Sequence, residues 1–185
     1  DMDWLGINPD EVVVQSDRME TYYDDMRTIL SRGGAYVTNS EAEHWRDLKK
    51  RSEAHPDRNR DSDVQLNEFE ALLSGSEGIV VIKTDLEDPN PALRDFVAFR
   101  VVESPHPRQK DKYRLWPLYN YAVAIDDHRL GVTHVLRGKD HLNNTLKQKW
   151  IYKYMGWDEP EYIHYGLVSI PDTNLKTSNI RESIS

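Results

Sequence analysis

Apolar residues recur at intervals of three and four between residues 19 and 30, and this spacing predicts an amphipathic helix. The residues that share the apolar face are Met19, Tyr22, Tyr23, Met26, Ile29 and Leu30. Asp17 and Glu20 have the spacing of a capping box, and Gly33 follows the segment as a helix terminator. We therefore expect a helix that begins at Asp17, ends before Gly33 and buries one face.

Short runs of β-branched and aromatic residues lie on both sides of this helix, EVVVQ at 11–15 and AYV at 35–37. Such runs are typical of buried strands. A strand, a helix and a second strand in succession are typical of parallel units. We therefore expect an α/β fold with a doubly wound sheet.

The same alternation resumes after residue 113. The expected elements are a strand that reaches Trp116, a helix over about 118–127, a strand over 133–137, a helix from Lys139 to Gly156 and a strand over 163–170. The last of these helices is expected to bury its large apolar residues, which are Leu142, Leu146, Trp150, Ile151, Tyr154 and Met155.

The segment between these two parts has a different pattern, rich in charge and in turn residues. Its expected elements are helices over 41–51 and around 66–73, and strands over 78–83 and 95–102. The turn PNPALR separates the two strands, because its prolines block regular structure. We interpret residues 39–112 as an α+β insertion between the first part of the main sheet, at 1–38, and the second part, at 113–185.

The composition narrows the class of protein. The 185 residues carry a net charge of −8, whereas dedicated nucleic-acid scaffolds are usually basic, so any nucleic-acid contact must use a local surface. There is no cysteine, which excludes disulfides and thiolate zinc sites. Without a membrane-length apolar run or a signal peptide, the sequence predicts a soluble, cytoplasmic protein. Both ends read as interruptions, which suggests a piece of a longer chain.

The run from Tyr113 to His141 mixes aromatic residues with many charged ones. Its acidic and imidazole side chains are Asp126, Asp127, His128, His134, Asp140 and His141. A metal site is one interpretation, but adjacent carboxylates on a helix diverge. The alternative is that these residues cap a helix and bond within the core, and we predict no metal site.

Arg137 lies at the end of the apolar strand THVLRG, before a glycine and a helix start. Ligands bind at the carboxyl ends of strands in open α/β sheets, and a guanidinium there can clamp a carboxylate. An ion pair with Asp126, Asp127 or Asp140 is an equally good interpretation. Tyr119 could present its hydroxyl to the same crevice, or it could belong to the core.

Two further groups of polar residues are candidates for phosphate contacts. The loop Lys176–Asn179 is either a phosphate-binding loop or plain solvated chain. Basic clusters at 46–51, 58–60 and 108–114 all lie in the predicted insertion. Each alone is typical of a solvated face, but together they would make a plausible surface for a phosphate backbone.

The order of the segments along the chain resembles one family closely. Archaeal-type glutamyl-tRNA synthetases contain segments similar to EVVVQSDRMETYYDDMRTILSRGGAYV, IKTDLEDPNPALRDFVAFR, YRLWPLYNYAVAIDDHRLGVTHVLRGKDHLNNTLKQKWIYKYMGW and PEYIHYG. These are class I synthetases, with glutaminyl-tRNA synthetases as near relatives. The resemblance implies a Rossmann-type catalytic domain, split by a connecting insertion that meets the acceptor end of tRNA. It also implies activation of glutamate with ATP and Mg²⁺, then transfer of the glutamyl group to the 3′ end of tRNA(Glu).

The resemblance also implies roles for particular residues. Arg137 would hold a carboxylate of the substrate, Tyr119 would lie against the glutamate side chain, and Asn120 would line the same pocket. The segment Leu175–Arg181 would be the second class I signature, with Lys176, Thr177 and Ser178 catalytic and with Lys176, Ser178 and Asn179 at ATP. The residues expected to meet tRNA are Lys49, Lys50, Arg51, Arg94 and Arg108.

Several positions depart from the family pattern. Asn120 stands where the family commonly has Asp, and Val81 stands where Arg is frequent. Lys176 and Asn179 stand where a Ser and a Lys are usual. The first signature, His-Ile-Gly-His, would precede Asp1, and the anticodon-binding domain would follow the chain.

We therefore expect a monomeric central catalytic fragment that is inactive alone. The alternatives are a glutaminyl-tRNA synthetase fragment, a non-catalytic tRNA-binding module, and a metal-dependent hydrolase built on the Asp-Asp-His cluster.

Overall fold

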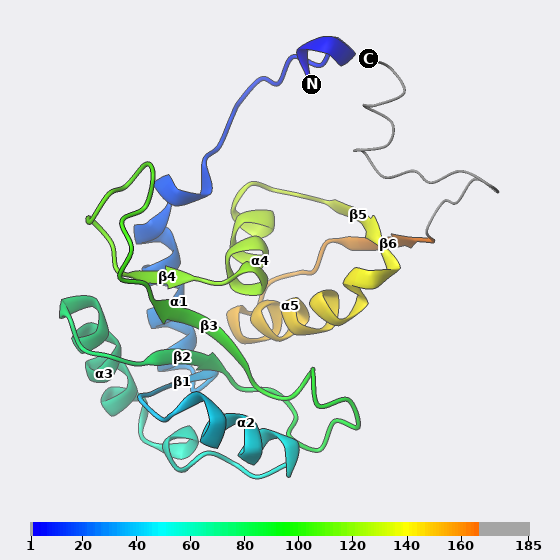
Figure 1. The fold of residues 1–185 in the computed structure, drawn as a ribbon. Coiled ribbons are helices and arrows are strands. Elements are labelled where there is room, and N and C mark those ends of the chain that lie inside the picture. Colours follow the sequence, from blue (N-terminus) through cyan, green and yellow to red (C-terminus); the bar gives the residue numbers. More distant parts are fainter. Residues whose placement is uncertain (1, 167–185) are drawn as a thin grey trace, which may run out of the picture.

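The computed structural model of the chain describes residues 2–166 and contains two sheets (Figure 1). One is a four-stranded antiparallel sheet and the other a two-stranded parallel sheet. The helices α1 (Met19–Ser31), α4 (Tyr119–Arg129) and α5 (Leu142–Met155) pack against one another. This mixed α/β architecture agrees with the fold class predicted from the sequence.

The four-stranded sheet has the order β1-β2-β3-β4. Its strands are β1 (Ala35–Thr38), β2 (Ile79–Ile82), β3 (Phe96–Val101) and β4 (Leu115–Pro117). Two more helices, α2 (Ala42–Lys50) and α3 (Ser62–Ser74), lie on the chain between β1 and β2. The predicted strands and helices of the central segment are therefore confirmed, within a few residues at their ends.

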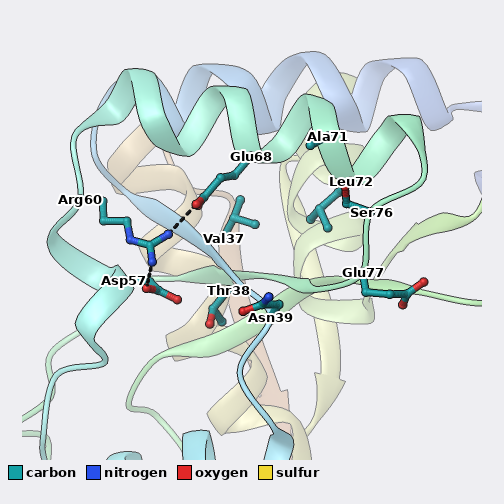
Figure 2. A pocket seen from close by; sticks show the side chains of 10 residues that line it. All are labelled: Val37, Thr38, Asn39, Asp57, Arg60, Glu68, Ala71, Leu72, Ser76 and Glu77. Atoms are coloured by element: carbon teal, nitrogen blue, oxygen red, sulfur yellow. Dashed lines mark hydrogen bonds and ion pairs between the residues drawn. The ribbon is translucent and has the colours of Figure 1, made fainter.

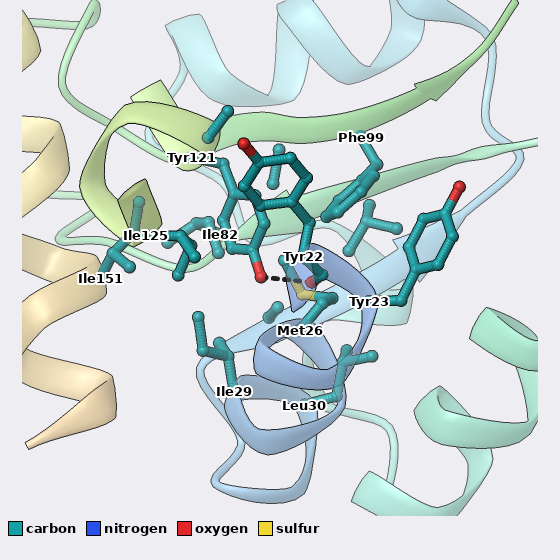
Figure 3. Packing of buried hydrophobic residues seen from close by; sticks show 14 of the residues in the cluster. Tyr22, Tyr23, Met26, Ile29, Leu30, Ile82, Phe99, Tyr121, Ile125 and Ile151 are labelled. Atoms are coloured by element: carbon teal, nitrogen blue, oxygen red, sulfur yellow. Dashed lines mark hydrogen bonds between the residues drawn. The ribbon is translucent and has the colours of Figure 1, made fainter. Parts of the chain in front are cut away.

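The core is aromatic and joins this sheet to α1 and α4 (Figure 3). The Phe99 ring lies 5.8 Å from Tyr23 and 4.9 Å from Tyr121, between ring centroids. Such pairs stabilise by about 1 kcal/mol each beyond the area that they bury. The buried hydroxyls are also bonded, because Tyr121 donates to the carbonyl of Tyr22 and Tyr23 donates to that of Leu115, both at 2.7 Å.

The second sheet contains the parallel unit that the sequence predicted after residue 113. Strand β5 (His134–Gly138) is followed by a 3₁₀ turn and α5, and the chain returns as β6 (Glu161–Tyr165). The register places Arg137 beside His164. Helix α5 ends at Gly156, whose φ of 68° is left-handed, so the predicted helix end is confirmed.

The beginning of the chain differs from the prediction. Residues 11–14 form neither helix nor strand, and Val12 is 75% exposed. No strand among residues 2–166 pairs with them, and β propensity alone does not make a strand. Helix α1 begins at Met19 without a side-chain cap, because the Asp17 carboxylate pairs with Arg108 instead. The expected strand and capping box are therefore wrong.

The parallel start predicted from the strand–helix–strand order is also wrong. Within the part of the chain that the structure describes, strand β1 pairs only antiparallel, with Ala35 opposite Ile82. Its sheet draws on all three predicted segments, since β1 precedes residue 39, β2 and β3 lie between 39 and 112, and β4 follows residue 113.

Helix α5 turns a different face inward from the one predicted. Leu142 and Leu146 are 48% and 44% exposed, whereas the polar Thr145 and Gln148 are buried. The buried stripe continues through residues 151, 152 and 155. The helix was placed correctly, but the expected burial of its two leucines is wrong.

Tyr154 fixes the end of α5 against the four-stranded sheet. Its ring lies over Gly34, where an added Cβ would approach the ring atoms to 2.5 Å. Its hydroxyl donates to the carbonyl of Lys83 at 3.1 Å, and the Lys83 amide donates to the carbonyl of Gly34 at 2.9 Å. The parallel unit is thus anchored to the strands β1 and β2.

Candidate functional site

Arg137 lies on β5 next to its C-terminal end, as the sequence predicted, and is only 8% exposed. Its Nη2 donates to Thr145 Oγ1 at 2.5 Å and to Gln148 Oε1 at 2.8 Å. The guanidinium carbon lies 5.1 Å from the centre of the Tyr162 ring. Two neutral side chains of α5 and an aromatic face of β6 therefore hold this cation.

No carboxylate in the described part of the chain lies within 4.0 Å of Arg137. Asp126 pairs with Arg18 at 2.7 Å, and Asp140 approaches His141 at 3.7 Å. The ion pair considered as an alternative from the sequence is thus absent from residues 2–166. A buried cation without a counter-ion is costly unless an anion joins it.

The guanidinium has one accessible end. Both hydrogens of Nη2 are used, and Nε is buried without a partner among the described residues. Nη1 has no hydrogen bond to these residues and is not among the buried unpaired atoms, so it reaches the surface. An incoming carboxylate would therefore meet Nη1 first. A bidentate clamp would have to displace Thr145 or Gln148, because both two-nitrogen edges of the group include Nη2.

The structure brings Asn120 to the same cluster. Asn120 is half-buried at the start of α4, and its Oδ1 accepts from Gln148 Nε2 at 3.5 Å, a long hydrogen bond. Tyr119 is 50% exposed beside it, with its ring 6.1 Å from that of His141. The three pocket residues expected from the resemblance thus come from two elements and lie around Gln148 and the end of β5.

Several buried polar atoms near Arg137 have no partner in the described residues. They are Arg137 Nε, Asp127 Oδ2, Tyr152 Oη and Tyr162 Oη. Burial raises the pKa of Asp127, although the nearby Arg137 opposes this shift. Burial likewise raises the pKa of Tyr162 to about 12. Unpaired buried polar groups are rare in folded proteins, and at a site they can serve a ligand.

Thr145 connects the cluster to β6. Its hydroxyl accepts from Arg137 and lies 2.8 Å from His164 Nε2. Sequence reasoning missed Thr145, Gln148 and His164. The signal for the first two is their spacing, since positions 145 and 148 continue the stripe formed by Ile151 and Met155.

The acidic run at the end of α4 has a structural role. Asp126 accepts hydrogen bonds from Arg18, Gln15 and Tyr22, and so attaches α4 to the start of the chain. The His128 ring stacks on Trp157 with 3.7 Å between centroids. Within residues 2–166 there is no group of three acidic or imidazole side chains arranged to hold a metal ion.

The basic residues expected to meet tRNA do not form one surface. Arg94 is 8% exposed and donates to the carbonyls of Asp88, Lys49 and Lys50, so it closes the end of α2. Lys49 donates to the carbonyl of Asp95 at 2.8 Å, and burial lowers its pKa to about 8. These two cations are thus directed to the protein's own backbone.

The other three basic residues are exposed but lie apart. Lys50 and Arg51 are at the end of α2, paired with Asp47 and Glu53. Arg108 pairs with Asp17 near the start of α1 and lies on the connection between β3 and β4, whereas α2 follows β1 at the other edge of the sheet. Only the pair at 50–51 presents adjacent exposed cations.

A separate cavity of about 270 Å³ lies between α3 and β1 (Figure 2). Arg60 bonds with Asp57 and Glu68 at its edge, and Thr38 and Asn39 line its floor. This cavity contains none of the expected site residues. The expected signature residues Lys176, Thr177, Ser178 and Asn179 lie outside the described part of the chain.

A helix that spans a membrane is both long and apolar. No helix among residues 2–166 combines the length and apolarity needed to cross a bilayer.

The described residues thus combine a parallel unit, with a buried cation near its strand end, and an antiparallel sheet. Residues 1–180 match the family model described as tRNA synthetases class I (E and Q), catalytic domain. The chain therefore belongs to this family.

Its relatives are named more narrowly. The chain is 50% identical over its whole length to the glutamate–tRNA ligase of Methanothermobacter thermautotrophicus and 48% identical to that of Methanocaldococcus jannaschii, covering 34% of each. It thus spans about a third of the length of these relatives.

Two solved structures share the fold. One is a glutamate-tRNA synthetase from Elizabethkingia anophelis, with a TM-score of 0.63 and 21% identity over 99% of this chain and 42% of that one. The other is a glutamate tRNA ligase from Elizabethkingia meningosepticum in complex with its amino acid, with a TM-score of 0.59 and 20% identity over 99% of this chain and 41% of that one. At these identities the likeness concerns the fold alone.

Proposed function

We propose that this chain is the central catalytic part of a glutamate–tRNA ligase. The proposed reaction activates glutamate with ATP to glutamyl-adenylate and transfers the glutamyl group to the 3′ end of tRNA(Glu). One observation carries this proposal: Arg137 is a buried cation with no carboxylate within 4.0 Å among the described residues. A glutamate carboxylate at Nη1 would supply the missing anion.

We further propose that the carboxylate at Nη1 is the side-chain carboxylate of glutamate, and not the α-carboxylate, which glutamine also carries. A neutral side-chain amide would leave the positive charge of Arg137 uncompensated, whereas a carboxylate forms a charge-assisted hydrogen bond. We therefore favour glutamate over the glutaminyl alternative. Tyr119 and Asn120 are the proposed neighbours of the glutamate side chain, because Asn120 contacts Gln148 and Tyr119 precedes Asn120 at the start of α4.

The metal-dependent hydrolase has little support. Asp126 and His128 are engaged with Arg18 and Trp157, and no other acidic or imidazole group in the described residues completes a ligand set with them.

The proposed ATP contacts rest on the family resemblance. Lys176, Ser178 and Asn179 would hold the phosphates with Mg²⁺, and Lys176, Thr177 and Ser178 would position them. ATP supplies the adenylyl group, and the ion neutralises phosphate charge. The role of this chain's residues would then be to orient the reactants and stabilise charge rather than to transfer protons.

For tRNA we propose that residues 39–112 contact the acceptor stem, with Lys50 and Arg51 as the exposed cations. Arg108 could reach phosphate only by exchanging its pairing with Asp17. Lys49 and Arg94 would then support the end of α2 instead of touching tRNA. We also propose a monomeric, cytoplasmic enzyme with the sheet interrupted by this insertion.

The test is glutamate-dependent exchange of pyrophosphate into ATP, with and without tRNA, in the full-length protein that contains this chain. We expect exchange with glutamate and not with glutamine. The Arg137→Ala variant should lose at least about a hundredfold in kcat/KM while it still binds tRNA. Absence of exchange with either amino acid would contradict the proposal. Binding of tRNA without exchange would favour a non-catalytic tRNA-binding module.

A further inference from the structure

Gln148 is a neutral hydrogen-bond partner of Arg137 that sequence reasoning did not assign. Its side chain is fully buried on α5, with 0% exposure. Its Oε1 accepts from Arg137 Nη2 at 2.8 Å, and its Nε2 approaches Asn120 Oδ1. It therefore touches both the cation and a residue of the proposed pocket.

The neutrality of this side chain is notable because a carboxylate would fit in the same space. Glutamine and glutamate have the same shape, and a glutamate here would form an ion pair with Arg137. The other partner of Nη2, Thr145, is also neutral, and the Tyr162 ring presents a π face. Every described group in contact with the guanidinium thus positions it without cancelling its charge.

We propose that Gln148 is a specificity-determining residue, which holds Arg137 in place while it leaves the positive charge available to a carboxylate of the substrate. This inference rests on the proposed function, because it assumes that the ligand of Arg137 is an amino-acid side chain. In this proposal, Gln148 favours an anionic substrate over a neutral one because its own side chain is neutral and does not compensate the charge of Arg137.

The physical basis is competition between two anions for one buried cation. With Gln148, no described carboxylate lies within 4.0 Å of Arg137, since the nearby Asp127 acts on it only at longer range, and the ligand can supply the contacting anion. With glutamate at position 148, the protein itself would supply that anion, and the attraction between the cation and an incoming carboxylate would be offset. A neutral substrate would lose nothing by this change.

A purely structural role for Gln148 makes a different prediction. If the side chain only satisfied a buried donor, a glutamate would do so at least as well, and substrate binding would stay the same. The isosteric substitution Gln148→Glu therefore separates the two roles.

The experiment compares wild-type and Gln148→Glu forms of the full-length protein in pyrophosphate exchange. We expect the KM for glutamate to rise at least about tenfold, with the KM for ATP unchanged. The ratio of kcat/KM for glutamine to that for glutamate should rise. The melting temperature should stay the same or increase, because the cation gains a partner.

Two further variants control for charge and for the loss of the acceptor. Asn143→Asp adds the same charge to an exposed position of α5, where the side-chain oxygen that Asn90 contacts is kept, and it should leave the KM for glutamate unchanged. Gln148→Met removes the acceptor but adds no charge. It should raise the KM for glutamate less than Gln148→Glu does, without favouring glutamine, and it remains informative if the glutamate variant does not fold.

The proposal is overturned if a folded Gln148→Glu variant has a KM for glutamate within about twofold of wild type. It is also overturned if the methionine and glutamate variants change this KM equally. A wild-type protein without glutamate-dependent exchange would instead contradict the proposed function, so the two failures are distinguishable.

Discussion

The two sheets of this molecule treat their buried polar groups differently. Around the four-stranded sheet, Asp95 accepts from Arg58 and Thr84, and the hydroxyls of Tyr23 and Tyr121 reach backbone carbonyls. Around the parallel pair β5–β6, buried polar atoms remain without partners, and they make up four of the five such side chains in the described residues. In a region with a purely structural role, buried polar groups have hydrogen-bond partners. In a region that binds a ligand, some of these groups lack a partner in the protein and can bond to the ligand.

The two sheets also differ in how far their apolar side chains are buried. All four residues of β1 are buried, whereas Leu136 on β5 is 66% exposed and Ile163 on β6 is 41% exposed. Parallel sheets are normally covered on both faces. The buried apolar core of residues 2–166 therefore includes residues of β1 to β4 and none of β5 or β6.

The largest expected effect compares the same kind of deletion in the two sheets. Phe99→Ala removes a fully buried ring of the aromatic core and should lower the free energy of unfolding by about 3–5 kcal/mol. Leu136→Ala on the exposed face of β5 should change it by less than about 1 kcal/mol. Urea unfolding of both variants of the 185-residue chain measures the difference. Equal losses would mean that the parallel pair is as well packed as the sheet.

The next effect concerns the buried ion pair of the four-stranded region. Asp95 is 3% exposed and accepts from Arg58 Nε at 3.0 Å and from the Thr84 amide at 2.8 Å. Asp95→Ala leaves Arg58 unpaired and should lower the free energy of unfolding by about 3 kcal/mol. The matched control is Asp17→Ala, which breaks the exposed pair with Arg108 and should cause no measurable change.

Removal of single buried hydroxyls should change the free energy of unfolding less, and it compares a hydrogen-bonded hydroxyl with an unbonded one. Tyr121→Phe deletes a buried hydrogen bond to Tyr22 and should cost about 1 kcal/mol of unfolding free energy. Tyr152→Phe deletes a buried hydroxyl that makes no well-formed hydrogen bond among residues 2–166, so it should cost less than Tyr121→Phe. Thermal melts of the two variants would contradict the comparison if Tyr152→Phe cost as much as Tyr121→Phe.

A further expected effect is on the pH dependence of the free energy of unfolding. Burial, with help from Lys147, lowers the pKa of Lys49 in the folded state to about 8, below the value of about 10.4 in an unfolded chain. Between these values the unfolded state binds the proton and the folded state does not, so the free energy of unfolding rises with pH. Urea midpoints at about pH 7.5 and 9.5 should show this increase. Lys49→Met should flatten it, and Lys50→Met should not.

Local patterns predicted most of the elements, because helix spacing and turn residues act over short distances. The face of α1 and the end of α5 at Gly156 were predicted correctly for this reason. The run at 11–15 had strand composition but no partner strand, and a strand depends on pairing with distant residues. The predicted parallel pairing of β1 was wrong for the same reason, because the partner of a strand is not set by its local sequence.

The site was predictable only in part. The position of Arg137 at a strand end indicated a ligand, and the family resemblance added Tyr119 and Asn120. The burial of Thr145 and Gln148 was not predictable from hydropathy, because the two polar residues face inward to bind a cation from another element. Likewise, Asp126 bonds Arg18 across 108 positions of sequence, a contact that no local pattern contains.

The packing of Tyr154 on Gly34 has a consequence for how this sequence can vary. Gly34 does not have a left-handed backbone conformation, so only the ring of Tyr154 excludes a side chain there. The two positions are therefore a coupled pair. In related sequences, a larger residue at position 34 should accompany a smaller one at position 154, and substitutions at one site alone should be rare.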